Sequence, residues 1–258
     1  MAGRTLFKWG RVYIDGYDMS GYDRAFGPFT WAFDEADMTA PQSDAAKGYL
    51  PNTCSIGCGT LNGLFDTTAT VGFHTVMSSI QSERIITYAM GDRAAPAAGV
   101  PVFAGQWVQD GYHAEDDSGA MVASVPFGAW DAANQIGYTV PWGYLLHANS
   151  AAAAANSSGD AQHDNGASSA LGGYMVVHGL AGDGTATITV QHSADEVDGN
   201  YANLGGCTSG ELDFSSVQSV VAATTAKTTT VERYIRWQIS LNTATTVTFV
   251  LSFIRGIH

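Results

Sequence analysis

The amino-acid sequence predicts an all-β protein with one short helix, arranged as two β-sandwich or β-barrel-like domains. Two segments, 231–241 (VERYIRWQISL) and 245–253 (TTVTFVLSF), alternate apolar and polar residues with the period of a half-buried strand. The chain also contains 30 glycines and only 14% charged residues, against roughly 25% in an average soluble domain. Short strands between glycine-containing turns are typical of sandwiches and barrels.

The first predicted domain covers residues 1–137 and opens with antiparallel strands. Segment 11–14 is apolar and ends at an Asp-Gly turn, and Phe, Trp and Phe alternate in 29–33. Residues 34–48 are acidic, contain a proline and lack an apolar period, so we expect a long loop there. The glycine-rich segment 56–65 then reads as the returning strand, with its glycines at a bulge or a close backbone approach.

One amphipathic helix is predicted near residues 70–82. Its apolar stripe consists of Phe73, Val76, Met77 and Ile80, which have helical spacing. Strand character returns after this helix, at 84–90, 100–103, 106–109 and 119–125. These strands complete the first domain.

The second predicted domain covers residues 138–258 and forms a C-terminal β-sandwich. A strand-like run at its start leads into segment 149–173, which is rich in Ala and Ser and is expected to be a loop. Further strands are expected at 174–178, 185–192 and 217–222. The dipeptide Asp183-Gly184 predicts a hairpin between two of them, and a second hairpin is expected between 231–241 and 245–253.

Charge and cysteine content exclude several classes of protein. The formal net charge is −13, and 11 basic residues spread over the chain cannot neutralise a row of phosphates, so stable nucleic-acid binding is not expected. The sequence has no apolar run of the roughly 20 residues that a membrane span needs, and it starts without a secretory signal. Cys54, Cys58 and Cys207 do not form a disulfide framework, so we expect buried free thiols and synthesis in a reducing cytoplasm.

Residues that carry chemistry do not combine into a known motif. Segment 34–37 spells the helicase tetrapeptide DEAD, but the chain lacks the phosphate loop which that motif requires. Cys54 and Cys58 lack a second pair of zinc ligands. Histidine stands beside carboxylates at 113–117 and 163–164, which is the composition of a weak metal or acid–base site but also of an acidic surface. We therefore expect no enzyme, no catalytic residue, no cofactor and no metal.

The six tryptophans allow a different reading, in which exposed indole rings stack on sugars. Trp31 and Trp237 lie on apolar faces of predicted strands and are expected in the core. Trp107, Trp130 and Trp142 have loop-like surroundings, where an interface and a core position are both open. A carbohydrate-binding sandwich is accordingly kept as an alternative function.

Segments 14–22 (IDGYDMSGY) and 50–66 (LPNTCSIGCGTLNGLFD), separated by an aromatic strand and an acidic excursion, resemble the N-terminal half of tail tube proteins from long-tailed, siphovirus-like bacteriophages. The second half is similar to the sandwich domain often attached in such proteins, through segments 184–191, 233–238 and 249–253. The cysteines at 54 and 58 and the Ala/Ser-rich segment depart from that pattern.

The resemblance implies a virion structural protein, made in the bacterial cytoplasm and located in the tail. Its subunits would form homo-oligomeric rings, trimeric or hexameric, that stack into a tube with other tail proteins, and DNA would pass through without specific binding. The predicted loop 34–48 is the candidate contact between subunits or rings. Its residues of interest are Asp34, Glu35, Asp37, Met38, Pro41 and Lys47. A capsid decoration (cement) protein is the alternative within the virion.

Overall fold

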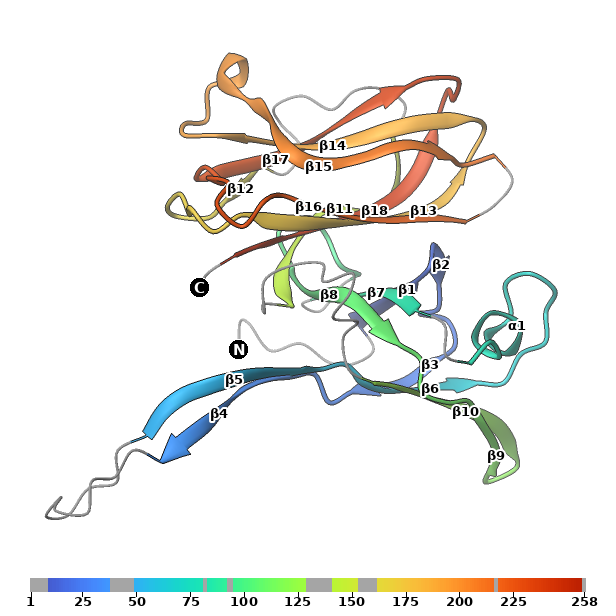
Figure 1. The fold of residues 1–258 in the computed structure, drawn as a ribbon. Coiled ribbons are helices and arrows are strands. Elements are labelled where there is room, and N and C mark those ends of the chain that lie inside the picture. Colours follow the sequence, from blue (N-terminus) through green and yellow to red (C-terminus); the bar gives the residue numbers. More distant parts are fainter. Residues whose placement is uncertain are drawn as a thin grey trace, which may run out of the picture.

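The computed structural model describes residues 9–37, 49–80, 83–91, 95–128, 141–152, 162–215 and 218–256. These residues form antiparallel sheets with one α-helix and a single turn of 3-10 helix, η2 (Asp198–Asn200), which confirms the all-β prediction. The arrangement is shown in Figure 1. No helix in the described ranges is long and apolar enough to cross a membrane.

The largest sheet has eight strands and runs through both halves of the chain. In spatial order they are β16 (Ser219–Thr224), β13 (Gly173–Gly182), β18 (Val247–Arg255), β11 (Trp142–Ala152), β8 (Pro101–Val108), β7 (Glu83–Met90), β1 (Gly10–Ile14) and β2 (Tyr17–Asp18). The halves join where β8 pairs with β11, with Phe103 opposite Trp142. The predicted boundary between 137 and 138 lies outside the described residues.

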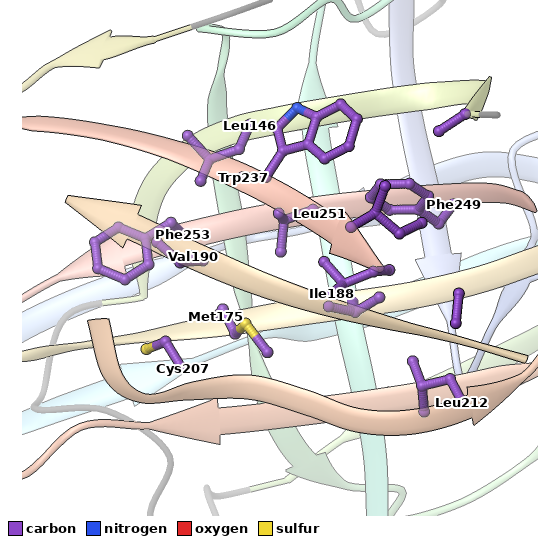
Figure 2. Close-up of a cluster of buried hydrophobic side chains, with 14 of the residues drawn as sticks. Leu146, Met175, Ile188, Val190, Cys207, Leu212, Trp237, Phe249, Leu251 and Phe253 are labelled. Atoms are coloured by element: carbon purple, nitrogen blue, oxygen red, sulfur yellow. The ribbon is translucent and has the colours of Figure 1, made fainter. Parts of the chain in front are cut away.

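The C-terminal half is a sandwich of two sheets. A second sheet, in the order β12 (His163–Asp164), β17 (Tyr234–Leu241), β14 (Thr185–Ser193) and β15 (Ala202–Asp213), faces the β16-β13-β18-β11 half of the large sheet. Side chains of both sheets interdigitate in one buried core, which includes Met175, Ile188, Trp237 and Phe249 (Figure 2). Burial of such side chains is the main stabilising term for the sandwich.

Neither of the two hairpins predicted for this half forms. β13 and β14 lie in opposite sheets, and so do β17 and β18. Each connection is therefore an arch that crosses the core. The two arches meet at one end of the sandwich, where the Asp183 carboxylate accepts hydrogen bonds from the backbone N–H groups of Thr245 (2.8 Å) and Thr246 (3.1 Å). Alternation in 231–241 and 245–253 correctly predicted Trp237 and Phe249 in the core, but it does not specify a pairing partner. β18 is not the half-buried strand predicted, because its other face is also buried, with Val250 and Ile254 in a second core.

The N-terminal half has its own core between the β8-β7-β1 half of the large sheet and a third sheet. That sheet contains, in order, β3 (Asp23–Gly27), β6 (Gly59–Leu64), β10 (Ala120–Phe127) and β9 (His113–Asp117). Helix α1 (Phe73–Met77) closes this core with three buried side chains. The helix is shorter than the predicted 70–82, and Ile80 of the predicted stripe is 52% exposed beyond its end.

Several segments predicted as loops contain strands. Residues 34–37 belong to β4 (Thr30–Asp37), and β11 and β12 occupy parts of 149–173. His113 to Asp117, for which the sequence predicted no strand, form β9. β15 was not predicted at all, because Gly205 and Gly206 interrupt the alternation of its buried Leu204, Cys207 and Leu212.

A third core fills the space between the halves, where Tyr13, Ala89 and Val102 pack against Tyr174, Val176 and Ile254. Buried polar contacts accompany it. The Tyr174 hydroxyl donates to the carbonyl of Ala104 at 2.8 Å. His178, fully buried, accepts the backbone N–H of Gly16 at Nδ1 (3.2 Å), and its Nε2 lies 3.0 Å from the Thr87 hydroxyl. Because Nδ1 accepts, Nε2 carries the proton and donates to Thr87.

Candidate assembly surface

The most prominent feature of the N-terminal half is an arm of two strands that projects from the body (Figure 1). It consists of β4 and β5 (Tyr49–Gly57), paired from Thr30 opposite Gly57 out to Asp37 opposite Tyr49. Among the described strands, β4 and β5 pair only with each other, so both outer backbone edges of the arm are open. Open edges offer unpaired N–H and C=O groups to a strand of another chain.

The sequence-predicted assembly residues divide between this arm and the part beyond it. Asp34, Glu35 and Asp37 are positions of β4, next to a register irregularity between Phe33 and Glu35. Met38, Pro41 and Lys47 lie outside the described residues. The predicted acidic loop is thus, over its first four positions, the outer end of a strand.

The root of the arm is fixed to the body by aromatic packing. The Phe29 ring lies 4.5 Å from that of Phe103 and 5.0 Å from that of Tyr88, measured between centroids. Just after β5, at the first position of β6, Gly59 has φ of +75°, and a Cβ there would lie 2.3 Å from the carbonyl carbon of Gly27. Only glycine fits this close approach, as the sequence predicted for this segment.

The sheet that carries the arm has one buried and one open face. Leu61, Val125 and Phe127 point into the core, whereas the opposite face carries Thr60, Asn62 and Ser124. Two charged groups of its end strands meet in an exposed ion pair, Arg24 with Asp117 at 2.6 Å. β9 is exposed along its whole length. Both end strands, β3 and β9, have an open outer edge among the described strands.

Asp23 on the edge strand β3 is the unusual ionisable group of this sheet. Its Oδ1 is buried and has no hydrogen-bond partner among the described residues. Burial raises the pKa of this carboxyl to about 7, against a smaller opposing effect of the Ala25 backbone N–H. The charge of this edge therefore changes near neutral pH.

The two sequence-predicted clusters of histidine and carboxylate lie on different strands, β9 and β12. His113 is exposed on β9. His163 stacks on the Tyr144 ring, with centroids 3.7 Å apart, and burial lowers its pKa. Its neighbour Asp164 is engaged by both Nε (2.7 Å) and Nη2 (2.6 Å) of Arg233. Within the described ranges, no group of three or more potential ligands could hold a metal ion.

Four of the six tryptophans have described side chains, and Trp9 among them is half-buried. Trp107 and Trp237 are buried, as predicted for Trp237, and Trp142 is half-buried against Phe103. Trp130 and the Trp31 side chain lie outside the description. Of the three cysteines, Cys58 and Cys207 are free and buried, and the side chain of Cys54 is not described.

No protein-family model and no curated protein sequence matches this chain. Among solved structures, it is similar to the SPP1 Dit protein, described as a paradigm of the hub adsorption apparatus in Gram-positive infecting phages, with 12% identity and a TM-score of 0.32 over 96% of this chain and 99% of that one. It is also similar to a chain of the phage P2 baseplate in its activated conformation with Ca, with 10% identity and a TM-score of 0.31 over 96% and 98% of the two chains. Both TM-scores are too low to establish a common fold.

Proposed function

We propose that this chain is a bacteriophage virion structural protein without enzymatic activity, and specifically a tail tube subunit that forms stacked rings. The observation that carries the proposal is the sheet β3-β6-β10-β9, which has two open edges, one open polar face and a projecting two-stranded arm. The tail tube assignment is suggested by the sequence, because segments 14–22 and 50–66 resemble tail tube proteins.

Ring formation accounts for the open edges. In a ring, the β9 edge of one subunit would pair with the β3 edge of the next, which closes a continuous barrel and removes every free edge of this sheet. The open face would then line the lumen. That face carries the acidic Glu115 of β9, paired opposite Val122, and belongs to a chain with a net charge of −13. DNA phosphates would therefore meet no cationic row to which they could adhere.

The arm extends beyond the barrel wall and would contact a neighbouring subunit or the next ring. β4 has eight residues and β5 has nine, and beyond the root both strands extend away from the body (Figure 1). A strand pair without a hydrophobic partner is marginally stable in water. An intersubunit contact supplies such a partner.

Deleting the arm tests the proposal. Thr30 and Gly57 are directly paired, so an Asn-Gly turn can replace residues 31–56 without disturbing β3 or β6. We expect the purified wild type to show rings or hollow tubes by negative-stain electron microscopy, and the deletion variant to remain a folded monomer, as judged by circular dichroism, that forms none.

A shorter deletion provides the matched control. Asp37 and Tyr49 are also paired, so the same turn can replace only residues 38–48 and keep both strands. Tubes from this variant would assign the contact to β4 and β5, and their loss would assign it to the segment that holds Met38, Pro41 and Lys47. Tubes from the longer deletion, or discrete particles of the wild type at every concentration, would overturn the proposal; compact trimers that bind capsids would indicate a decoration protein.

A further inference from the structure

The outer face of the sandwich sheet β12-β17-β14-β15 carries a regular array of polar side chains, here called the polar platform. Three rows cross the sheet, each with one residue on the central strand β14 and its directly paired neighbours on β17 and β15. The rows are Ser240–Thr187–Glu211, Gln238–Thr189–Thr208 and Arg236–Gln191–Asn203. The opposite faces of the same strands supply Ile188, Val190 and Trp237 to the core.

The polar platform is hollowed. A cavity of about 470 Å³ opens on it, lined by the polar residues Thr187, Thr189, Asn203, Gln238 and Ser240 and by the apolar residues Ile239 and Leu241. This volume lies within the range of small-molecule sites, roughly 300–1,000 Å³. None of the side chains that line it is charged.

Gln191 fixes the orientation of the amides at the cavity. The guanidinium of Arg236 can only donate, so the Gln191 atom 2.8 Å from its Nε is the carbonyl oxygen Oε1. The Nε2 of Gln191 must then be the donor to its two other contacts, Oδ1 of Asn203 and Oε1 of Gln238, each at 2.9 Å. Both neighbours turn their oxygen toward Gln191, and their NH₂ groups therefore point away from it.

The side chains that orient these amides, Gln191 and Arg236, are themselves held in place by burial and by further contacts. Gln191 and Arg236 are each 7% exposed, although they lie on the outer face of the sheet. The guanidinium forms an ion pair with Asp198 and lies 4.0 Å from the centroid of the Tyr201 ring. The charge of Arg236 is thus already neutralised by Asp198. Because the amides are oriented before a ligand arrives, binding does not lose conformational entropy to orient them.

We propose that the polar platform binds a neutral saccharide. The cavity presents two oriented amide NH₂ groups and the hydroxyls of Thr187, Thr189 and Ser240, which suit a ligand with many uncharged hydroxyl and ring oxygens. An anionic ligand would find no free cation at the cavity and would face Glu211 at the end of one row. An apolar ligand would leave these donors unpaired.

This site differs in position from the assembly surface and does not rest on the proposed function. β14, β15 and β17 form the outermost layer of the molecule, at the end opposite to the arm (Figure 1). It also differs from the sugar site considered from sequence, since the tryptophan of these strands, Trp237, points into the core and the amides take the contact instead.

The test records side-chain amide signals of the full ¹⁵N-labelled chain by NMR during titration with maltotriose, lactose and chitotriose at millimolar concentrations. We expect the NH₂ signals of Asn203 and Gln238 to shift with at least one of these sugars. The amide of Gln106, on β8 and bonded to Glu83, serves as the internal control and should not move. Because this measurement uses the wild type, it does not depend on the folding of any variant.

Variants then assign the shift to the cavity. Gln238→Ala and Asn203→Ala each remove one NH₂ group from a solvent-accessible position, and each should weaken binding about fivefold, the equivalent of one hydrogen bond of roughly 1 kcal/mol. Gly205→Ala, on β15 but outside the polar platform and the cavity lining, adds a Cβ that meets nothing within 4 Å and should bind like the wild type. The proposal is overturned if no sugar shifts the two amides, if both alanine variants bind unchanged, or if a neutral tripeptide amide shifts them where the sugars do not.

Discussion

At the scale of single residues, His178 makes stability depend on pH. Burial lowers the pKa of this imidazole to about 3, because the folded chain holds it neutral between Gly16 and Thr87. The unfolded chain binds a proton below its ordinary pKa of about 6.5, and the folded chain does not until near pH 3. Between these values the unfolded state binds more protons, so the free energy of unfolding falls by roughly 1 kcal/mol for each pH unit of acidification.

We expect His178→Asn to reduce this acid sensitivity, since asparagine keeps an acceptor but does not titrate. Urea unfolding at pH 7.5 and pH 4.5 gives the free energy of unfolding at each pH. The difference between the two values should be smaller for His178→Asn than for the wild type, whatever the variant's stability at neutral pH. Equal pH dependence of wild type and His178→Asn would contradict the assignment.

At the scale of elements, the two arches of the sandwich depend on Asp183. Its carboxylate accepts the Thr245 hydroxyl and the backbone N–H groups of Thr245 and Thr246, and these hydrogen bonds lower its pKa. A lowered carboxyl pKa means that the contribution to stability is present above the unfolded value of about 4 and is lost as the pH falls.

Asp183→Ala should therefore lower the Tm by several degrees at pH 7 and have little effect once the carboxyl is protonated. Thermal unfolding, followed by circular dichroism at pH 7 and at a pH well below the ordinary carboxyl pKa of about 4, measures this effect. Asp183→Asn is the matched variant, because its amide oxygen still accepts a backbone N–H. Its Tm at pH 7 should fall by less than that of Asp183→Ala. If Asp183→Ala lowered the Tm at low pH as much as at pH 7, the ionised carboxylate would not be the stabilising group.

The arches also show why the sequence predicted strands better than their pairing. Two of the four Asp-Gly dipeptides in this chain show the difference. Asp15 and Gly16 both have positive φ and form the two-residue hairpin between β1 and β2, whereas Asp183 and Gly184 have no positive φ and cross the core. The dipeptide permits a hairpin but does not impose one. Both partners of β13, β16 and β18, and one of the two partners of β14, β17, are distant in the sequence.

The candidate sites were predictable to unequal extents. The acidic composition of 34–37 identified the region of the arm, but not that these residues continue a strand. The polar platform was not predicted, because its rows are made of residues on three strands whose register no local pattern reveals. Alternating Thr and Gln in 187–191 was the one available signal, and it is equally typical of any solvated sheet face.

At the scale of the whole molecule, the halves are joined by the pairing of β8 with β11 and by the core that they share. We expect a single cooperative thermal transition, with equal calorimetric and van't Hoff enthalpies. Gly143 lies at this junction, and a Cβ there would be 2.2 Å from the Phe253 carbonyl oxygen, so Gly143→Ala should cost about 1–3 kcal/mol of stability.

Gly199→Ala is the control for that substitution, because a Cβ at Gly199 meets nothing within 4 Å. It should leave the Tm within about a degree of the wild type, since surface substitutions usually change stability by less than roughly 0.5 kcal/mol. Two separate transitions in the wild type, or an unchanged Tm for Gly143→Ala, would show that the halves unfold independently.

The position of β18 has a consequence for biosynthesis. It is the last described strand to leave the ribosome, yet it lies between β13 and β11 in the large sheet. Until it is inserted, those two strands have no common neighbour, and Phe249, Leu251 and Phe253 are missing from the sandwich core. Until β18 is synthesised, the nascent chain therefore exposes the unpaired edges of β13 and β11 and part of the apolar core. Premature termination before β18 would yield an aggregation-prone fragment and not a smaller folded protein.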